Sequence, residues 1–255
     1  MLTNSKKKKL MVHLRDYHKK YLEKKLTDLD ESGTRLMVNT FLTDVLGFAA
    51  IEEVKTEYMI KGTYADYVIQ TKGNRHFLVE VKSLSLNLTE KHLRQAVNYG
   101  ANEGIEWALL TNGKNFELYR ILFNKPINER LVFSIDLSNR KLLKDSLEHL
   151  QYLDRDSVSH HGLDQLWNRC VALDPSNISK LILAPQVINF VRRTLKRKFK
   201  AKFTNHEVVN SLKRVIYEVV PFEEIKKTKT RKKNKSNKPP SIATPSEVIA
   251  PQNTQ

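Results

Sequence analysis

Residues 64–83 read YADYVIQTKGNRHFLVEVKS, and the arrangement of the central strands follows from them. Its two halves, 64–69 and 76–83, are rich in β-branched and aromatic side chains. A polar break at Lys72-Gly73-Asn74 separates them. Apolar runs of this kind around a short break that contains glycine predict two strands joined by a tight turn.

Three charged side chains are expected to converge at one end of this hairpin. Glu80 and Lys82 are two positions apart, so on a strand they point to the same face. Asp66 lies at the start of the preceding strand, and a hairpin can bring it alongside Glu80. Buried charges are unfavourable unless they are paired. Two carboxylates suit a hard divalent cation such as Mg²⁺, and a neighbouring lysine suits an attacking water or a phosphoryl oxygen that gains negative charge.

The composition points to a basic protein of a reducing compartment. A chain of 255 residues is long enough for one to two domains, and its net charge of +16 is typical of proteins that meet nucleic acid or another acidic surface. The single cysteine, Cys170, excludes an intramolecular disulfide framework and a cysteine-based zinc site. No apolar run approaches the length of a membrane span. We therefore expect a cytoplasmic protein without a membrane partner.

Helical and strand patterns succeed one another along the first part of the chain. Apolar residues at three- and four-residue steps predict helices, and β-branched runs predict strands. The expected helices cover 2–29, 37–46 (ending at Gly47) and 88–102, and the expected strands cover 51–61, the two halves of the hairpin, 106–111, 115–123 and 131–135. This order predicts an α/β fold with a mixed sheet and helices packed against it.

From residue 140 the pattern becomes helical, with helices expected over 141–153, 163–174, 176–184, 185–203 and 205–218. In the fourth of these, Val187, Phe190, Val191, Thr194 and Leu195 are expected to form a buried stripe. A basic face remains outside, and its candidate nucleic-acid-binding residues are Arg192, Arg193, Lys196, Arg197 and Lys200. Contact with phosphates is one interpretation of this face, and an ordinary solvated surface is the other.

The last part of the chain is basic and contains several prolines. Lys226 to Lys238 holds eight lysines or arginines and no apolar residue, a composition that cannot bury a core and predicts disorder. The sequence thus predicts four parts: an N-terminal helix over 1–29, an α/β domain over 30–150, a helical basic domain over 151–222 and a disordered tail over 223–255.

Four short motifs give this chain a family resemblance. They are Ala65-Asp66-Tyr67-Val68, Val79-Glu80-Val81-Lys82, Gln95-Ala96-Val97-Asn98-Tyr99 and Leu110-Thr111-Asn112-Gly113. In this order, over roughly residues 30 to 140, they resemble the N-terminal nuclease domain of type I restriction enzyme R subunits, a branch of the PD-(D/E)XK nucleases. Ala65 stands where that motif has proline. R subunits carry a helicase motor after the nuclease, and none is expected here, since these 255 residues contain no Gly-x-x-x-x-Gly-Lys-Ser/Thr loop.

The resemblance implies a restriction-endonuclease-like αβββαβ core and assigns roles to particular residues. Asp66 and Glu80 would hold Mg²⁺ or Mn²⁺ together with the carbonyl oxygen of Val81. Lys82 would orient the attacking water or stabilise charge on the phosphate. Three further residues would support the site: Glu31, Gln95 and Tyr99. From the residues alone, Glu31 can equally be a helix-capping residue beside Asp30, and Gln95 and Tyr99 can be ordinary helix residues.

The expected function is therefore a magnesium-dependent endodeoxyribonuclease of a restriction or defence system. Its expected partners are DNA and either a second copy of the chain or separate motor and specificity subunits. An alternative is a non-catalytic nucleic-acid-binding module that retains the nuclease fold. A third interpretation places the function in the basic helix and tail, which would bind RNA or another anionic partner.

Overall fold

The computed structural model describes residues 2–23, 29–60 and 63–217. By its internal contacts the chain divides into one unit over Met1–Ala184 and a second over Pro185–Gln255. The predicted disordered tail over 223–255 lies outside the described residues, and the division into four parts stays a prediction. None of the described helices is both long and apolar enough to span a membrane.

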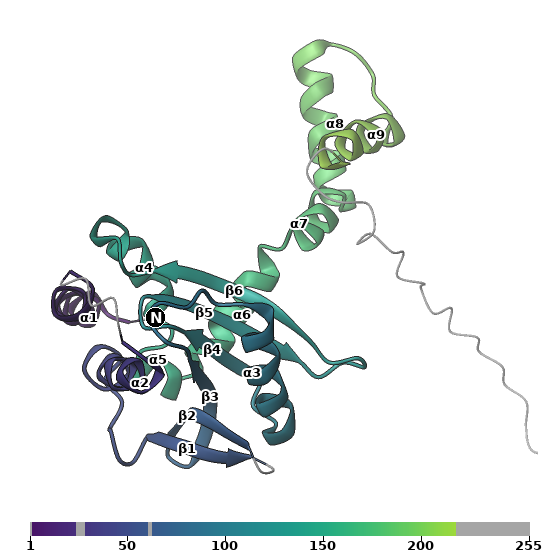
Figure 1. Ribbon diagram of the computed structural model, residues 1–255. Coiled ribbons are helices and arrows are strands. Elements are labelled where there is room, and N and C mark those ends of the chain that lie inside the picture. Colours follow the sequence, from purple (N-terminus) through teal and green to yellow (C-terminus); the bar gives the residue numbers. More distant parts are fainter. Residues whose placement is uncertain (1, 24–28, 61–62, 218–255) are drawn as a thin grey trace, which may run out of the picture. The chain divides into compact units, whose positions relative to one another are not determined.

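A six-stranded mixed sheet forms the centre of the first unit (Figure 1). Its strands lie side by side in sequence order, and β3 and β4 are the one parallel pair among the described strands. The strands are β1 (Val54–Ile60), β2 (Thr63–Thr71), β3 (Asn74–Val81), β4 (Trp107–Thr111), β5 (Asn115–Leu122) and β6 (Asn128–Asp136). The predicted mixed α/β fold is confirmed.

The predicted central hairpin is the pair β2–β3. Its turn consists of Lys72 and Gly73, which both have positive φ values, 50° and 80°. Two-residue turns of this kind match the right-handed twist of the flanking strands, and glycine adopts the required conformation without steric cost. In the resulting register Tyr67 lies opposite Val79, so the hairpin brings the ends of residues 64–83 together.

Helices cover both faces of the sheet (Figure 1). On one face, α1 (Asn4–Tyr17) and α2 (Glu31–Thr40), which run on into η1 (His18–Leu22) and η2 (Phe41–Val45), pack against side chains such as Phe77, Val79 and Phe116. The same apolar cluster includes residues of α4 (Leu143–Leu150), α5 (Arg155–Ser159) and α6 (Gly162–Ala172). On the other face, α3 (Glu90–Glu103) packs on Val68, Leu78 and Leu110. The helix α7 (Pro175–Ile182) ends the first unit.

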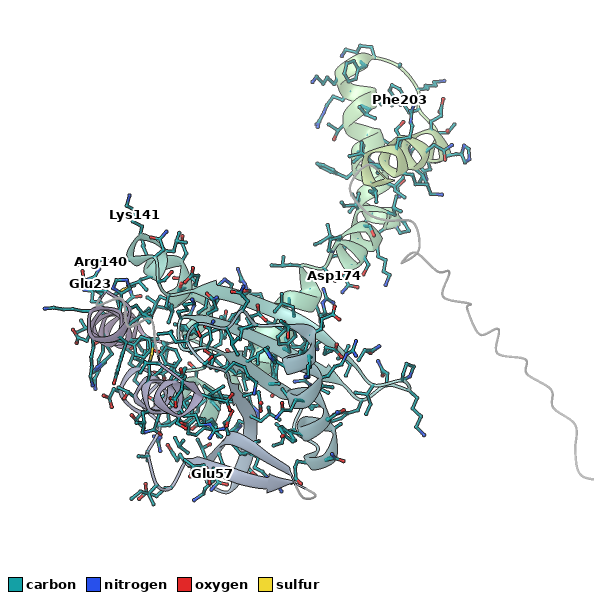
Figure 2. The ribbon with its side chains drawn as sticks, in the orientation of Figure 1. Glu23, Glu57, Arg140, Lys141, Asp174 and Phe203 are labelled. Carbon is teal, nitrogen blue, oxygen red and sulfur yellow. The ribbon has the colours of Figure 1, made fainter. Side chains whose placement is uncertain are left out.

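The N-terminal helices are also tied to the segment after β6. Arg140 Nη1 lies 3.9 Å from Glu23 Oε1 and links the residue after η1 to the short helix η3 (Arg140–Leu142) (Figure 2). The buried hydroxyl of Tyr17 donates a 2.6 Å hydrogen bond to the carbonyl oxygen of Gly113, in the β4–β5 turn. The helix expected over 2–29 is thus observed as α1 and η1, and residues 24–28 lie outside the described part.

The second unit contains α8 (Pro185–Phe199) and α9 (Asn205–Tyr217). The helix expected over 185–203 ends four residues early, because Lys200 has a φ of 56° and its backbone N–H donates to the carbonyl of Lys196. The expected buried stripe is wrong: Phe190 is 67% exposed, Val187 is also exposed, and Val191, Thr194 and Leu195 are half-buried. The buried residue of α8 is Ile188. A helix with a single described neighbour in its unit has a narrower buried side than the sequence pattern suggested.

A glycine sets the close approach of α3 to the sheet. A Cβ atom on Gly100 would lie 2.3 Å from Cδ1 of Ile121 and 2.7 Å from the carbonyl oxygen of Ile105. The backbone oxygen cannot move aside easily, so a side chain at this position must push α3 outward. The helix α3 connects the parallel strands β3 and β4. An outward shift of α3 would therefore loosen its packing on Val68, Leu78 and Leu110.

We predict that Gly100→Ala lowers the free energy of unfolding by about 2–3 kcal/mol, the upper part of the usual range for overpacking, because one of the close atoms is a backbone oxygen. Urea denaturation monitored by circular dichroism measures this change. Gly73→Ala is the matched control, because nothing lies within 4 Å of its added Cβ. Its positive φ alone should lower the free energy of unfolding, by about 1 kcal/mol. An equal or smaller loss for Gly100→Ala would contradict the close approach described above.

Candidate active site

Two buried carboxylates lie on neighbouring strands. Tyr67 on β2 pairs with Val79 on β3, so Asp66 and Glu80 are the next positions on each strand and face each other. Directly opposed residues of an antiparallel pair have Cβ atoms about 4.5–5.5 Å apart. Asp66 is 7% exposed and Glu80 is 1% exposed. The structure therefore brings these two predicted site residues together.

Both oxygen atoms of Asp66 have partners. Oδ2 accepts a 2.7 Å hydrogen bond from the backbone N–H of Val81 on the neighbouring strand. Oδ1 lies 2.6 Å from Nε of Arg35, a residue of α2. The carboxylate is thus fixed by the sheet on one side and by a cation from a helix on the other.

Lys82 is paired with Glu80, as their spacing predicts. Its Nζ donates a 2.6 Å hydrogen bond to Glu80 Oε1. Oε2 of Glu80 is buried and has no hydrogen-bond partner among the described residues. The backbone N–H of Lys82 donates to the carbonyl of Thr111 at 2.8 Å, so the main chain stays attached to β4 just beyond the end of β3.

The beginning of α2 completes the charged cluster. Asp30 caps the helix, since its Oδ1 accepts a 2.7 Å hydrogen bond from the N–H of Gly33. Glu31 has different partners: Oε1 lies 2.8 Å from Nη2 of Arg35, and Oε2 lies 3.7 Å from Nζ of Lys82. Of the two alternatives for Glu31, the geometry places it in the cluster. Its supporting role stays a prediction.

Burial and neighbouring charges shift the acidity of the central groups. Burial raises the pKa of Glu80 to about 7; the hydrogen bond from Lys82 works against this rise, and the charge of Asp66 adds to it. Burial also raises the pKa of Asp66, although the Val81 N–H and Arg35 oppose that shift. Burial disfavours the charge on Lys82, yet its hydrogen bond to Glu80 and the nearby carboxylates together raise its pKa. Lys82 is therefore an ammonium group at neutral pH.

The oxygen atoms of this cluster are of the type that a hard divalent cation prefers, and the cation itself stays a prediction. Glu31, Asp66 and Glu80 offer three carboxylates against the two cations Arg35 and Lys82, and Oε2 of Glu80 is a buried oxygen that lacks a donor among the described residues. The described residues contain no group of three or more His, Cys, Asp or Glu side chains placed to hold a metal. The predicted site thus depends on two carboxylates and on backbone oxygen, such as the Val81 carbonyl.

The helix α3 places Gln95 and Tyr99 next to each other. Nε2 of Gln95 donates a 2.9 Å hydrogen bond to Oη of Tyr99, which is 6% exposed. No hydrogen bond joins either residue to Asp66, Glu80 or Lys82 in the part of the chain described here. His92 stands one turn earlier, and burial together with the charge of Lys82 lowers its pKa. His92 thus lies within electrostatic reach of the cluster.

Sequence reasoning missed two residues of this region. Arg35 stands four positions after Glu31, so the spacing of an i,i+4 ion pair on one helix could have indicated it. His92 precedes Gln95 by three positions, which puts both on one side of α3, but the sequence contains no sign that the charge of Lys82 affects His92.

The predicted nucleic-acid-binding residues lie in the second unit. Arg193, Lys196 and Arg197 are exposed on α8, Arg192 is half-buried, and Lys200 follows the helix. Residues 185–217 contain nine lysines or arginines and one acidic residue, Glu207. This concentration of positive charge fits phosphate contact, which stays a prediction.

Comparison with known protein families gives one match. Residues 30–131 match the model of the family described as the type I restriction enzyme R protein N terminus (HSDR_N). The matched segment runs from the cap of α2 into β6 and includes Asp66, Glu80 and Lys82. It confirms the resemblance read from the sequence motifs and indicates a restriction-related nuclease module. Comparisons with curated proteins and with solved structures gave no match.

The raised pKa of Glu80 predicts how the stability of the metal-free protein depends on pH. The folded protein holds this proton up to about pH 7, whereas the ordinary value is 4.5, so the folded state binds more protons between these limits. The free energy of unfolding should therefore fall as the pH rises through this window. Glu80→Gln, which cannot titrate, should remove this part of the decrease. Urea denaturation in chelator from pH 4 to 8 measures it, and parallel curves for both proteins would contradict the shift.

Proposed function

We propose, from the match of residues 30–131 to this restriction-enzyme family, that the chain is a metal-dependent DNA endonuclease. The observation that carries the proposal is the buried cluster itself. Asp66 and Glu80 face each other across β2 and β3, and Lys82 is hydrogen-bonded to Glu80. Charges of this kind are costly to bury and add little to stability, so a chemical role is the better explanation for them.

Asp66, Glu80 and the carbonyl of Val81 would hold Mg²⁺ or Mn²⁺. The bound ion would supply a more acidic water and positive charge for the scissile phosphate. The β2–β3 hairpin contributes rigidity, since the Val81 N–H fixes Oδ2 of Asp66 and keeps the two carboxylates at a constant separation.

Lys82 would act as a donor and not as a base. Its pKa is raised, so it keeps its proton at neutral pH. A fixed ammonium group can orient a water or stabilise negative charge on the phosphate as the P–O bond breaks. Its hydrogen bond to Glu80 Oε1 holds Nζ at the cluster while other protons of the group remain available.

DNA would be the substrate, and the basic residues of α8 would add contacts to its backbone. Such contacts are independent of sequence and weaken as salt rises. Sequence choice and strand separation would come from separate specificity and motor subunits, in keeping with the restriction-enzyme family, or from a second copy of the chain. The cytoplasm is the compartment where such an enzyme would act.

A non-catalytic nucleic-acid-binding module is the second candidate, and one observation favours it. Asp66 is already paired with Arg35, and Glu80 is already paired with Lys82, so the cluster carries cationic partners without a metal. In that case the fold and the basic residues would bind nucleic acid, and the cluster would serve stability alone.

We predict that purified protein nicks supercoiled plasmid DNA in Mg²⁺ or Mn²⁺ and is inactive in chelator. Asp66→Ala and Glu80→Ala should each lower the rate roughly a hundredfold or more, since each removes a carboxylate that would hold the metal, and Lys82→Ala should do the same because it removes the positive charge beside the reacting phosphate. Glu90→Gln is the matched control, because this carboxylate on α3 is 88% exposed and pairs with Arg94 alone among the described residues. Cleavage that survives in chelator, or a fully active Glu80→Ala protein, would reject the mechanism.

A separate prediction concerns Gln95. If the Gln95–Tyr99 pair supports the site, Gln95→Ala should lower the cleavage rate markedly with little change in melting temperature, since Gln95 is exposed. Initial rates of plasmid nicking and thermal melting measure the two effects. An unchanged rate would mean that Gln95 is an ordinary helix residue, and a loss of stability large enough to explain the lower rate would count against a role in the site.

A further inference from the structure

Arg35 lies between two carboxylates of the cluster. Its Nε is 2.6 Å from Oδ1 of Asp66, and its Nη2 is 2.8 Å from Oε1 of Glu31. We infer that Arg35 and a divalent cation compete for Oδ1 of Asp66, so that Arg35 lowers the metal affinity of the site and is displaced when the metal binds. This inference rests on the proposed metal site and adds a determinant of its affinity.

The charges of the cluster make such an exchange reasonable. Without a metal, Arg35 pairs with Glu31 and Asp66, and Lys82 pairs with Glu80, so each carboxylate already has a cationic partner. A divalent cation added with Arg35 still in place would bring two like charges to the same oxygen. Repulsion between them is strong where solvent is largely excluded, and Asp66 is 7% exposed. Binding is therefore easier if the guanidinium leaves Oδ1.

Arg35 is also the partner of Asp66 that can move. The other partner is the backbone N–H of Val81, which is held in β3. The Arg35 side chain is 34% exposed, and its Nε, although close to Oδ1, has no hydrogen bond in the described structure. A contact between opposite charges that lacks an aligned hydrogen bond is easier to exchange for a metal–oxygen bond than one that has it. Lys82, by contrast, has an aligned hydrogen bond to Glu80 and a side chain that is 11% exposed.

The fold does not depend on the Arg35 side chain to keep α2 in position. The hydroxyl of Tyr67 donates a 2.7 Å hydrogen bond to the carbonyl oxygen of Arg35, which any residue provides. The hydroxyl of Thr34 accepts a 3.0 Å hydrogen bond from the N–H of Leu84. A substitution at Arg35 should therefore leave α2 docked beside the hairpin and change mainly the charge next to Asp66.

The test is a titration with Mn²⁺ without DNA, in which free Mn²⁺ is followed by electron paramagnetic resonance. Wild type is compared with Arg35→Gln, Arg35→Lys and the control Arg94→Gln, which removes an exposed arginine from an i,i+4 pair on α3. We expect Arg35→Gln to bind Mn²⁺ about tenfold more tightly, the value of one hydrogen bond or ion pair to a charged group. Arg35→Lys should lie between wild type and Arg35→Gln, and Arg94→Gln should match wild type.

Thermal melting gives a second measurement. In chelator, Arg35→Gln should melt at a lower temperature than wild type, because Asp66 loses its cation. Saturating Mn²⁺ should restore more of this loss than it adds to wild type. An arginine that served packing alone would, when replaced, weaken metal binding or leave it unchanged, so a gain in affinity distinguishes competition from a structural role.

The Glu31→Gln Arg35→Gln double variant identifies the oxygen that is contested. Its Mn²⁺ affinity is compared with that of Glu31→Gln alone. If Arg35 competes at Asp66, the double variant still binds Mn²⁺ more tightly than Glu31→Gln. Equal affinities of these two variants would show that Arg35 shields Glu31 and would overturn the inference. Equal affinities of wild type and Arg35→Gln, or no Mn²⁺ binding by either, would also overturn it. Tighter binding by Arg35→Gln with no DNA cleavage by wild type would support the inference and reject the proposed nuclease.

Discussion

The hydrogen bond from the Val81 N–H to Oδ2 of Asp66 is the contact on which the candidate site depends. It replaces a solvent contact of a buried carboxylate with a donor that belongs to the neighbouring strand. Because a backbone donor cannot rotate away, the carboxylate of Asp66 has one position relative to β3. The register of β2 and β3 places Glu80 beside Asp66, and the two-residue period of the strand places Lys82 beside Glu80. The helix α2 adds Glu31 and Arg35 to the cluster.

The balance of charge in this cluster explains why it can be stable before any ligand arrives. Each carboxylate has a cation or a backbone donor within reach, yet Oε2 of Glu80 has none among the described residues. If every oxygen of the cluster were paired, the cluster would have a structural role alone. If none were paired, these charged groups could not be buried. An intermediate condition of this kind is what the proposed cation site would need, since it would have to fold before the cation binds.

Most of the fold could be predicted from the sequence, because its signals are local. The period of two in residues 64–83, with Lys72-Gly73 between the halves, fixes the hairpin and therefore the meeting of Asp66 with Glu80. The contact of Arg35 with Asp66 could not be predicted in the same way, since it depends on how α2 docks on the sheet. Phe190 was misjudged for a related reason: helical spacing shows which residues share a side but not how much of that side a partner covers.

The two-residue spacing of Glu80 and Lys82 has a consequence for how this chain tolerates insertions and deletions. Adding or removing one residue between them would turn Lys82 to the opposite face, away from the carboxylates. The turn at Lys72-Gly73 has no such constraint from the cluster, because lengthening a loop changes neither strand's alternation. Among homologues of this chain, insertions and deletions should therefore occur at that turn and be absent between residues 80 and 82.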